Sequence, residues 1–227
     1  MTSELSLTVA GVRLACRNSG ALWLQSARTL VVADLHLEKG SAYAVRGQLL
    51  PPFDTAETLS RLEAEVVASN PQTMVLLGDS FHDRRAGERL SRETHARFQA
   101  LAEGRRMIWV RGNHDADLPA GLPGSAVEDF AVGGMRLVHE PGETGAEGEV
   151  AGHLHPCARV KGRSGSVRRR CFVTDGRRIV LPAFGAYAGG LNVCNPAISG
   201  LLQRPIQTVV LGANRVYAVA WTSLIRD

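Results

Sequence analysis

The chain has few of the features that mark secreted, membrane or disulfide-stabilised proteins. Its four cysteines show no C-x-x-C spacing, which disfavours a zinc knuckle or a redox pair and leaves free thiols as the expectation. No apolar run approaches the roughly eighteen residues that a membrane span needs. The amino terminus also lacks the charged and apolar segments of a secretion signal. We therefore expect a cytoplasmic protein with no membrane contact.

Aromatic residues are scarce, at 5% of the chain, whereas basic residues gather in one segment. The formal net charge is +4, and eight Lys and Arg residues lie between Pro156 and Val180 beside a single acid, Asp175. Such a run is either the solvated face of a hairpin or a surface that attracts a polyanion such as DNA or RNA. Because few aromatics accompany it, base stacking in this segment is not strongly indicated.

The first half of the chain alternates between strand-like and helix-like segments. Asp54, followed by Glu57, resembles a capping box and predicts a helix that ends at Asn70 and Pro71. A second amphipathic helix is expected over Glu88–Ala102. Buried strands are expected at Thr29–Ala33, Thr73–Leu77 and Met107–Val110.

The second half contains short β-like runs with no long helix between them. The runs are Met135–His139, Glu149–Gly152, Cys171–Thr174, Ile179–Leu181 and Val216–Trp221. A β-α-β-α-β half followed by a β-rich half predicts an α/β fold, with two sheets packed face to face and helices outside. The sequence contains no repeat or obvious linker, so we expect a single domain over residues 1–227.

Histidines and acidic residues recur just after the predicted strands. The blocks are Asp34-Leu35-His36, Gly78-Asp79, Gly112-Asn113-His114-Asp115, His139, and Gly152-His153-Leu154-His155. The carboxyl ends of strands converge on one crevice in open α/β folds, so these side chains can meet. Mixed oxygen and imidazole donors suit Mn²⁺, Fe²⁺ or Zn²⁺. Because alternate strand residues share a face, we expect His153 and His155 to point the same way from one strand end.

In this order, the five blocks resemble those of the calcineurin-like metallophosphoesterase superfamily. The resemblance implies a four-layer sandwich of two mixed sheets flanked by helices, and a centre of two metal ions. The ligands it implies are Asp34, His36 and His155 for one ion, Asn113, His139 and His153 for the other, and Asp79 as the bridge. It also implies that His114 acts on the substrate while Asp115 orients it. A hydroxide shared by the two ions would then attack phosphorus.

Four longer stretches resemble a narrower family, the bacterial ligase-associated DNA-damage-response endonucleases of the PdeM type. The stretches are Asp34–Gly40, Leu77–Asp83, Ala151–Pro156 and Leu181–Asn192. This resemblance implies a Mn²⁺-dependent phosphodiesterase that cleaves single-stranded DNA as an endonuclease in DNA repair. It further implies a functional association with an ATP-dependent DNA ligase, a helicase and an exonuclease.

Several assignments stay open at this point. Substrate contacts are expected from Lys39, Arg46, Arg168, Arg169 and Arg170, with a solvated surface position as the alternative. His82 and Asp83 are not counted as metal ligands, although either could shape the pocket. A small-molecule or nucleotide phosphodiesterase, or a phosphomonoesterase, would use the same metal blocks. A non-catalytic scaffold is disfavoured because every expected ligand is present.

Overall fold

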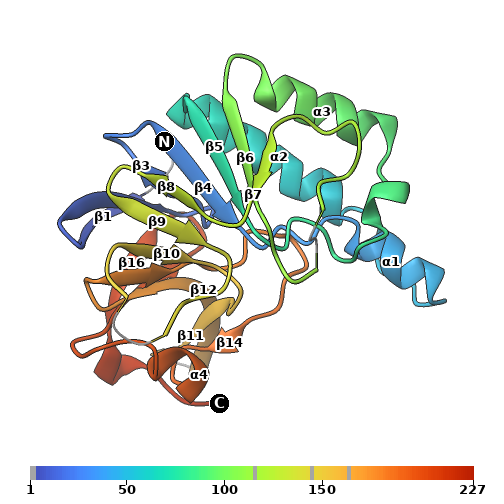
Figure 1. The fold of residues 1–227 in the computed structure, drawn as a ribbon. Helices are drawn as coiled ribbons and strands as arrows, with labels where there is room; N and C mark the ends of the chain where they lie inside the picture. The colour runs from blue at the N-terminus through green and yellow to red at the C-terminus, as the bar shows by residue number, and fades with distance from the viewer. Residues whose placement is uncertain (1–3, 115–116, 144–145, 163–164) are drawn as a thin grey trace.

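The computed structural model describes residues 4–114, 117–143, 146–162 and 165–227, which form two β-sheets packed face to face (Figure 1). The first sheet has seven strands in the order β1 to β7. The second has nine, in the order β14-β11-β12-β13-β10-β9-β8, with β15 also paired to β12 and β16 paired to β15. Both sheets mix parallel and antiparallel pairs, which confirms the predicted α/β sandwich. Within the described residues, no helix is long and apolar enough to cross a membrane.

The parallel half of the first sheet fixes where the polar blocks lie. Strand β4 (Thr29–Ala33) pairs in parallel with β5 (Thr73–Leu77), and β5 with β6 (Arg106–Val110). Parallel neighbours need crossovers, which α2 (Asp54–Ser69) and α3 (Arg92–Ala102) provide. The carboxyl ends of β4, β5 and β6 therefore share one edge of the sheet. The remaining strands of this sheet are β1 (Glu4–Val9), β2 (Val12–Arg17), β3 (Leu22–Leu24) and β7 (Ser125–Val127).

In the second sheet, β10 (Glu149–Ala151) lies parallel to both of its neighbours, β9 (Met135–Val138) and β13 (Arg178–Val180). The outer face of the second sheet is covered by the segment around the single-turn helix α4 (Pro196–Ser199) rather than by long helices. The other strands are β8 (Phe130–Val132), β11 (Pro156–Gly162), β12 (Gly165–Thr174), β14 (Leu191–Asn192), β15 (Gln207–Leu211) and β16 (Val216–Ala220).

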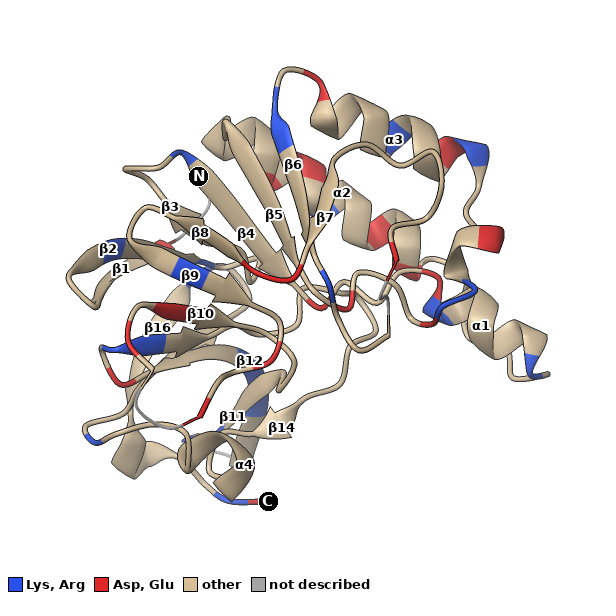
Figure 2. Cartoon of the chain, in the orientation of Figure 1, with Lys and Arg blue, Asp and Glu red and all other residues tan. Residues whose placement is uncertain are grey.

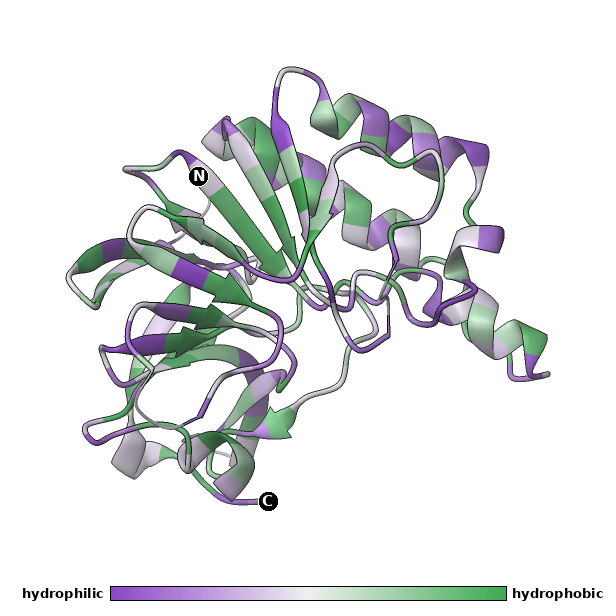
Figure 3. Ribbon diagram, in the orientation of Figure 1, coloured by the Kyte–Doolittle hydropathy of each residue, from purple (hydrophilic) through white to green (hydrophobic). Residues whose placement is uncertain are grey.

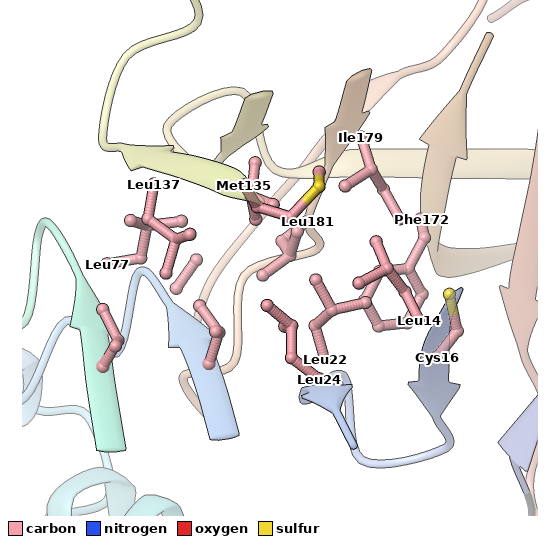
Figure 4. Close-up of a cluster of buried hydrophobic side chains, with 14 of the residues drawn as sticks. Leu14, Cys16, Leu22, Leu24, Leu77, Met135, Leu137, Phe172, Ile179 and Leu181 are labelled. Carbon is pink, nitrogen blue, oxygen red and sulfur yellow. The ribbon is translucent and has the colours of Figure 1, made fainter. Parts of the chain in front are cut away.

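Strand β4 shows why its sequence is an unbroken apolar run. Val31 and Ala33 point into the core between the two sheets, whereas Leu30 and Val32 point into the core under α2 and α3. Both faces are buried, so the strand is apolar after Thr29, whose hydroxyl donates to the Ala27 carbonyl. Figure 4 shows part of the core between the sheets, where Leu22 and Leu77 of the first sheet face Phe172 and Leu137 of the second.

Two predicted helix starts are wrong. Asp54 is the first residue of α2 and does not cap it; its carboxylate instead accepts the backbone N–H groups of Lys39 and Gly40 at the start of α1 (Lys39–Val45). Helix α3 begins at Arg92 because Ser91 is its N-cap, accepting the N–H of Thr94 at 3.0 Å. The residues before it form the short 3₁₀ turn η1 (Ala86–Glu88), and a second turn, η2 (Trp221–Ser223), follows β16.

Candidate metal centre

The polar blocks converge where strands of the two sheets end. Asp34 directly follows β4, and the Gly78-Asp79 block follows β5 in the neighbouring position of the same sheet. Gly152 follows β10 of the second sheet and lies against this edge, because a Cβ on it would meet the Asp34 Oδ2 atom at 2.7 Å. The packing of the two sheets therefore brings the His153–His155 segment onto the carboxyl ends of β4 and β5.

One cluster contains Asp34, His36 and His155, with ligand atoms within 4.8 Å of one another. The Nε2 atoms of His36 and His155 are 3.1 Å apart, and His155 Nε2 is 3.4 Å from Asp34 Oδ1. Asp34 is fully buried, and its carboxylate accepts the backbone N–H of His153 at 2.9 and 3.1 Å. This hydrogen bond fixes the carboxylate beneath the two imidazoles.

A second cluster contains Asp79, His139 and His153. His139 Nε2 lies 3.4 Å from Asp79 Oδ1 and 3.2 Å from His153 Nδ1. The other ring nitrogen of His139 is 3.7 Å from Asp34 Oδ1, so the two clusters are direct neighbours. The structure thus groups six of the seven expected ligands as two adjacent sets.

The block after β6 lies beside Asp79. The backbone N–H of His114 donates to Asp79 Oδ1 at 3.0 Å, and its ring Nε2 is 3.9 Å from Asp79 Oδ2. The His114 side chain is 51% exposed, which leaves it open toward solvent. Asn113, just before it, is also exposed, and its ligand role stays a prediction. Asp115 lies outside the described residues.

The pKa values of three site residues are shifted by burial and by their neighbours. Burial and the neighbouring His155 lower the pKa of His36 to about 3, so its imidazole is neutral at neutral pH. Burial alone would raise the pKa of Asp79, but the hydrogen bond and charge of His139 outweigh it and lower that pKa below its usual range. The pKa of His139 moves in the opposite sense: burial would lower it, and the hydrogen bond and charge of Asp79 raise it.

The donor set fits divalent transition metals. Within the described residues, the cationic partners of Asp34 and Asp79 are histidines, with no Lys or Arg ion pair to either carboxylate. The Nδ1 atom of His36 is buried without a hydrogen-bond partner. Ring nitrogens that face one another across 3.1–3.2 Å, next to buried carboxylates, suit cations placed between them.

The ligands sit on unusual backbone. Asp34, His36, Asp79, His153 and His155 all have positive φ, between 44° and 67°. This conformation costs a residue with a side chain about 1–3 kcal/mol and typically persists at functional sites. The expectation that His153 and His155 share a strand face is wrong. Both lie beyond the end of β10, and their rings belong to different clusters because the left-handed backbone redirects them.

Above the clusters is a pocket of about 440 Å³. Its lining consists of His36, Lys39, His82, His114, His153, Leu154, His155 and Ala188–Leu191. The ring of His82 stacks parallel to that of His114, with centroids 6.3 Å apart. A cleft of similar volume near Gly133 has Arg13 as its single titratable lining residue among those described, and so offers no comparable chemistry.

One wall of this pocket comes from the Leu181–Asn192 stretch, for which the sequence predicts a buried strand with a tight glycine turn near the site. Gly185 donates its N–H to the Asp34 carbonyl, and a Cβ on it would meet the Leu35 carbonyl oxygen at 2.2 Å. Only glycine fits this approach. In the sequence, the Gly189-Gly190 pair indicates that the backbone itself lines the pocket here. Lys39 Nζ holds the wall from the opposite side by donating to the Tyr187 carbonyl at 2.9 Å.

The basic segment is not one exposed ridge. Arg178 is 1% exposed and lies 3.4 Å from the Glu149 carboxylate, so it is a core residue. Arg170 is partly buried and donates to the Ala183 carbonyl at 2.7 Å; burial and nearby Arg61 lower its pKa to about 10, which leaves it charged at neutral pH. Arg168 donates to the Gly190 carbonyl on the pocket wall.

Arg169 and Arg46 are exposed. Arg169 neighbours Arg168 on β12 and so points to the opposite face of that strand. Arg46 caps the carboxyl end of α1. The substrate roles of Lys39, Arg46 and the three consecutive arginines stay predictions.

The calcineurin-like phosphoesterase family model matches residues 27–180. The chain belongs to the calcineurin-like phosphoesterase family. This phosphoesterase is similar to the nuclease MPE of Pseudomonas putida, with a TM-score of 0.73 and 27% identity over 96% of this chain and 100% of that chain. Yfce, a phosphoesterase from E. coli, is 18% identical over 87% of this chain and 96% of its own, with a TM-score of 0.40. No curated protein matches. Family membership and the two clusters identify a metal-dependent phosphoester hydrolase.

Proposed function

We propose that this phosphoesterase is a binuclear, Mn²⁺-dependent endonuclease that cleaves single-stranded DNA in bacterial DNA repair. The proposal is carried by two adjacent carboxylate–imidazole clusters beneath an open pocket, in a chain similar to a nuclease over almost its full length. A cytoplasmic location, one domain over residues 1–227, and the association with a ligase, a helicase and an exonuclease stay predictions.

The ligand assignment follows the two clusters. Asp34, His36 and His155 would hold one ion, His139 and His153 the other with Asn113, and Asp79 would lie between both. Divalent ions bound there supply Lewis acidity and a nucleophilic water near neutral pH. The lowered pKa of Asp79 keeps that carboxylate anionic, and the neutral imidazole of His36 offers its lone pair without first losing a proton.

His114 would act on the substrate. Its backbone is fixed by the hydrogen bond to Asp79, while its half-exposed ring lines the pocket above the clusters. An imidazole in this position can hold a proton at Nε2 and deliver it to the departing oxygen of the phosphodiester. Asp115, the next residue, would orient that ring.

The direct test compares three substrates with the purified, Mn²⁺-supplemented protein. Hydrolysis of bis(4-nitrophenyl) phosphate together with cleavage of circular single-stranded DNA supports the nuclease. Hydrolysis of the small diester alone would overturn the nuclease assignment and leave a small-molecule phosphodiesterase. Activity restricted to 4-nitrophenyl phosphate would identify a phosphomonoesterase.

Replacing His114 separates substrate chemistry from metal binding. We expect His114→Ala to keep both ions, because no ligand of either cluster is removed, and to cleave DNA about 10²- to 10⁴-fold more slowly. Asp79→Ala should instead lose bound metal. Metal content by plasma mass spectrometry and single-turnover DNA cleavage measure both effects, and loss of the ions from His114→Ala would contradict the assignment.

A further inference from the structure

An arm projects from the body beside the pocket (Figure 1). It comprises α1 and the residues after it, 39–53, and we call it the α1 arm. Its two ends are joined at the base, where the Asp54 carboxylate accepts the N–H of Lys39 at 2.9 Å and of Gly40 at 3.2 Å. Thr55 adds a second tie by accepting the N–H of Glu38 at 2.9 Å. The arm is therefore anchored firmly where it leaves the body.

The arm exposes large apolar side chains from the end of α1 to its return to the body. Val45 is 73% exposed, Leu49 91% and Phe53 65%, all within nine residues. The ribbon of α1 carries hydrophobic colouring toward its outer end (Figure 3). Elsewhere in the described chain, the exposed large apolar residues are single and scattered: Val67, Val167 and Tyr217. Scattered residues of that kind are normal, whereas a local concentration marks a contact surface.

The base of the arm is continuous with the pocket. Lys39 at its first position lines the pocket, and one turn later the ring of Tyr43 lies with its centroid 5.7 Å from that of His82. A substrate strand that leaves the pocket past Lys39 and Tyr43 would therefore run along the arm.

Charge indicates what the arm contacts. Residues 39–53 contain Lys39 and Arg46 and no Asp or Glu, and Figure 2 shows basic colouring at the outer end of α1. A surface that is basic, apolar and free of acids complements a chain with anionic phosphates and flat apolar rings. It is less suited to a second copy of itself, which would present the same charge.

We propose that the α1 arm binds the nucleotides next to the scissile phosphate, with Leu49 and Phe53 against the faces of unpaired bases and Arg46 at a phosphate. This rests on the proposed nuclease function and extends it to strand selection. Bases in a duplex cover their faces by stacking, so an apolar arm favours single strands.

The test compares Leu49→Ser/Phe53→Ser with Val67→Ser, a matched control that removes an 83% exposed apolar side chain from α2. Binding of a fluorescent single-stranded oligonucleotide is followed by anisotropy without added Mn²⁺, so that it does not depend on cleavage. We expect the double variant to raise Kd roughly 5- to 100-fold and the control to leave it unchanged. Hydrolysis of bis(4-nitrophenyl) phosphate should stay within about twofold of wild type, because neither residue lines the pocket.

A Kd equal to that of Val67→Ser would overturn the arm's role and leave the nuclease standing. If the wild-type protein binds the oligonucleotide but never cleaves it, the proposed nuclease function is wrong. The comparison of Kd values still tests the arm in that case. A change of oligomeric state in light scattering, with Kd unchanged, would make the arm a contact between copies and reject the proposal.

Discussion

At the scale of single residues, glycines decide whether the ligands can reach one another. Gly78 has a φ of 69°, and a Cβ on it would lie 2.1 Å from His139 Nδ1. His139 can therefore lie across the end of β5, between Asp34 and Asp79, only because position 78 lacks a side chain. The positive φ of Asp34 and Asp79 works with this glycine to bring both carboxylates to the same imidazole.

We expect Gly78→Ala to displace His139 and lower the metal content from two ions toward one. Gly104→Ala is the matched control, because Gly104 has a similar φ of 67° but nothing within 4 Å of an added Cβ. The control should lose about 1–2 kcal/mol of unfolding free energy, which is the cost of placing an alanine in the left-handed backbone conformation. Denaturation and metal analysis of both variants measure the difference. Two retained ions in Gly78→Ala would show that the ring tolerates the methyl group.

At the scale of elements, successive side chains of β12 point to opposite faces of the sheet, and this separates the three consecutive arginines. Cross-strand register pairs Arg168 with Arg159 and Arg169 with Ala158, so the two arginines occupy opposite faces of the β11–β12 hairpin. The face of Arg168 adjoins the pocket through the Gly190 carbonyl. The opposite face continues into the apolar cluster that contains Ala158.

This sorting predicts unequal roles for neighbouring arginines. If Arg168 contacts a phosphate, as the sequence predicts, Arg168→Gln should weaken single-stranded DNA cleavage several-fold and make its salt dependence less steep by roughly 0.7 in log–log slope. Arg169→Gln, on the far face, should change neither. The measurement is cleavage rate against NaCl concentration for each variant. Equal slopes for the two variants would show that this face of the β11–β12 hairpin does not contact the DNA.

At the scale of the whole molecule, the metal centre joins the two sheets. Asp34 and Asp79 follow strands of the first sheet, and His139 and His153 follow strands of the second. Ions held between them would crosslink the layers, and only the folded chain assembles both ligand sets. Metal binding should therefore stabilise the packing of one sheet on the other.

Removing the metals should lower the melting temperature. An ion at one hundred times its Kd adds about 2.7 kcal/mol per site, and for a chain of this length each kcal/mol shifts Tm by roughly 2–4 °C. We expect Mn²⁺ to raise the Tm of the EDTA-treated protein by about 5–10 °C or more. Asp79→Ala should show a smaller rise. An unchanged Tm for wild type would mean that the clusters bind no ion tightly.

Local patterns predicted much of this protein. The bounds of β4 and β5 agree with the structure residue for residue, because each buried parallel strand is a β-branched residue followed by a short apolar run. The resemblance to the calcineurin-like phosphoesterases, confirmed by the family model, came from short blocks in which the ligand residues lie within one turn after a strand. The start of α2 was misread because its acidic first residue serves another segment, a contact that no local pattern contains.

The sequence by itself determined which residue types gather at strand ends, and thereby the class of chemistry. The family resemblance already placed His155 with Asp34 and His153 with His139, and the two clusters agree with that grouping. Only the tertiary structure decided that the rings of His153 and His155 leave the chain in different directions, and that Arg178 is buried whereas the α1 arm is exposed. These outcomes depend on how two sheets pack and on left-handed backbone at five ligands. Contacts between distant segments, rather than propensities along the chain, supply the free energy that holds such geometry.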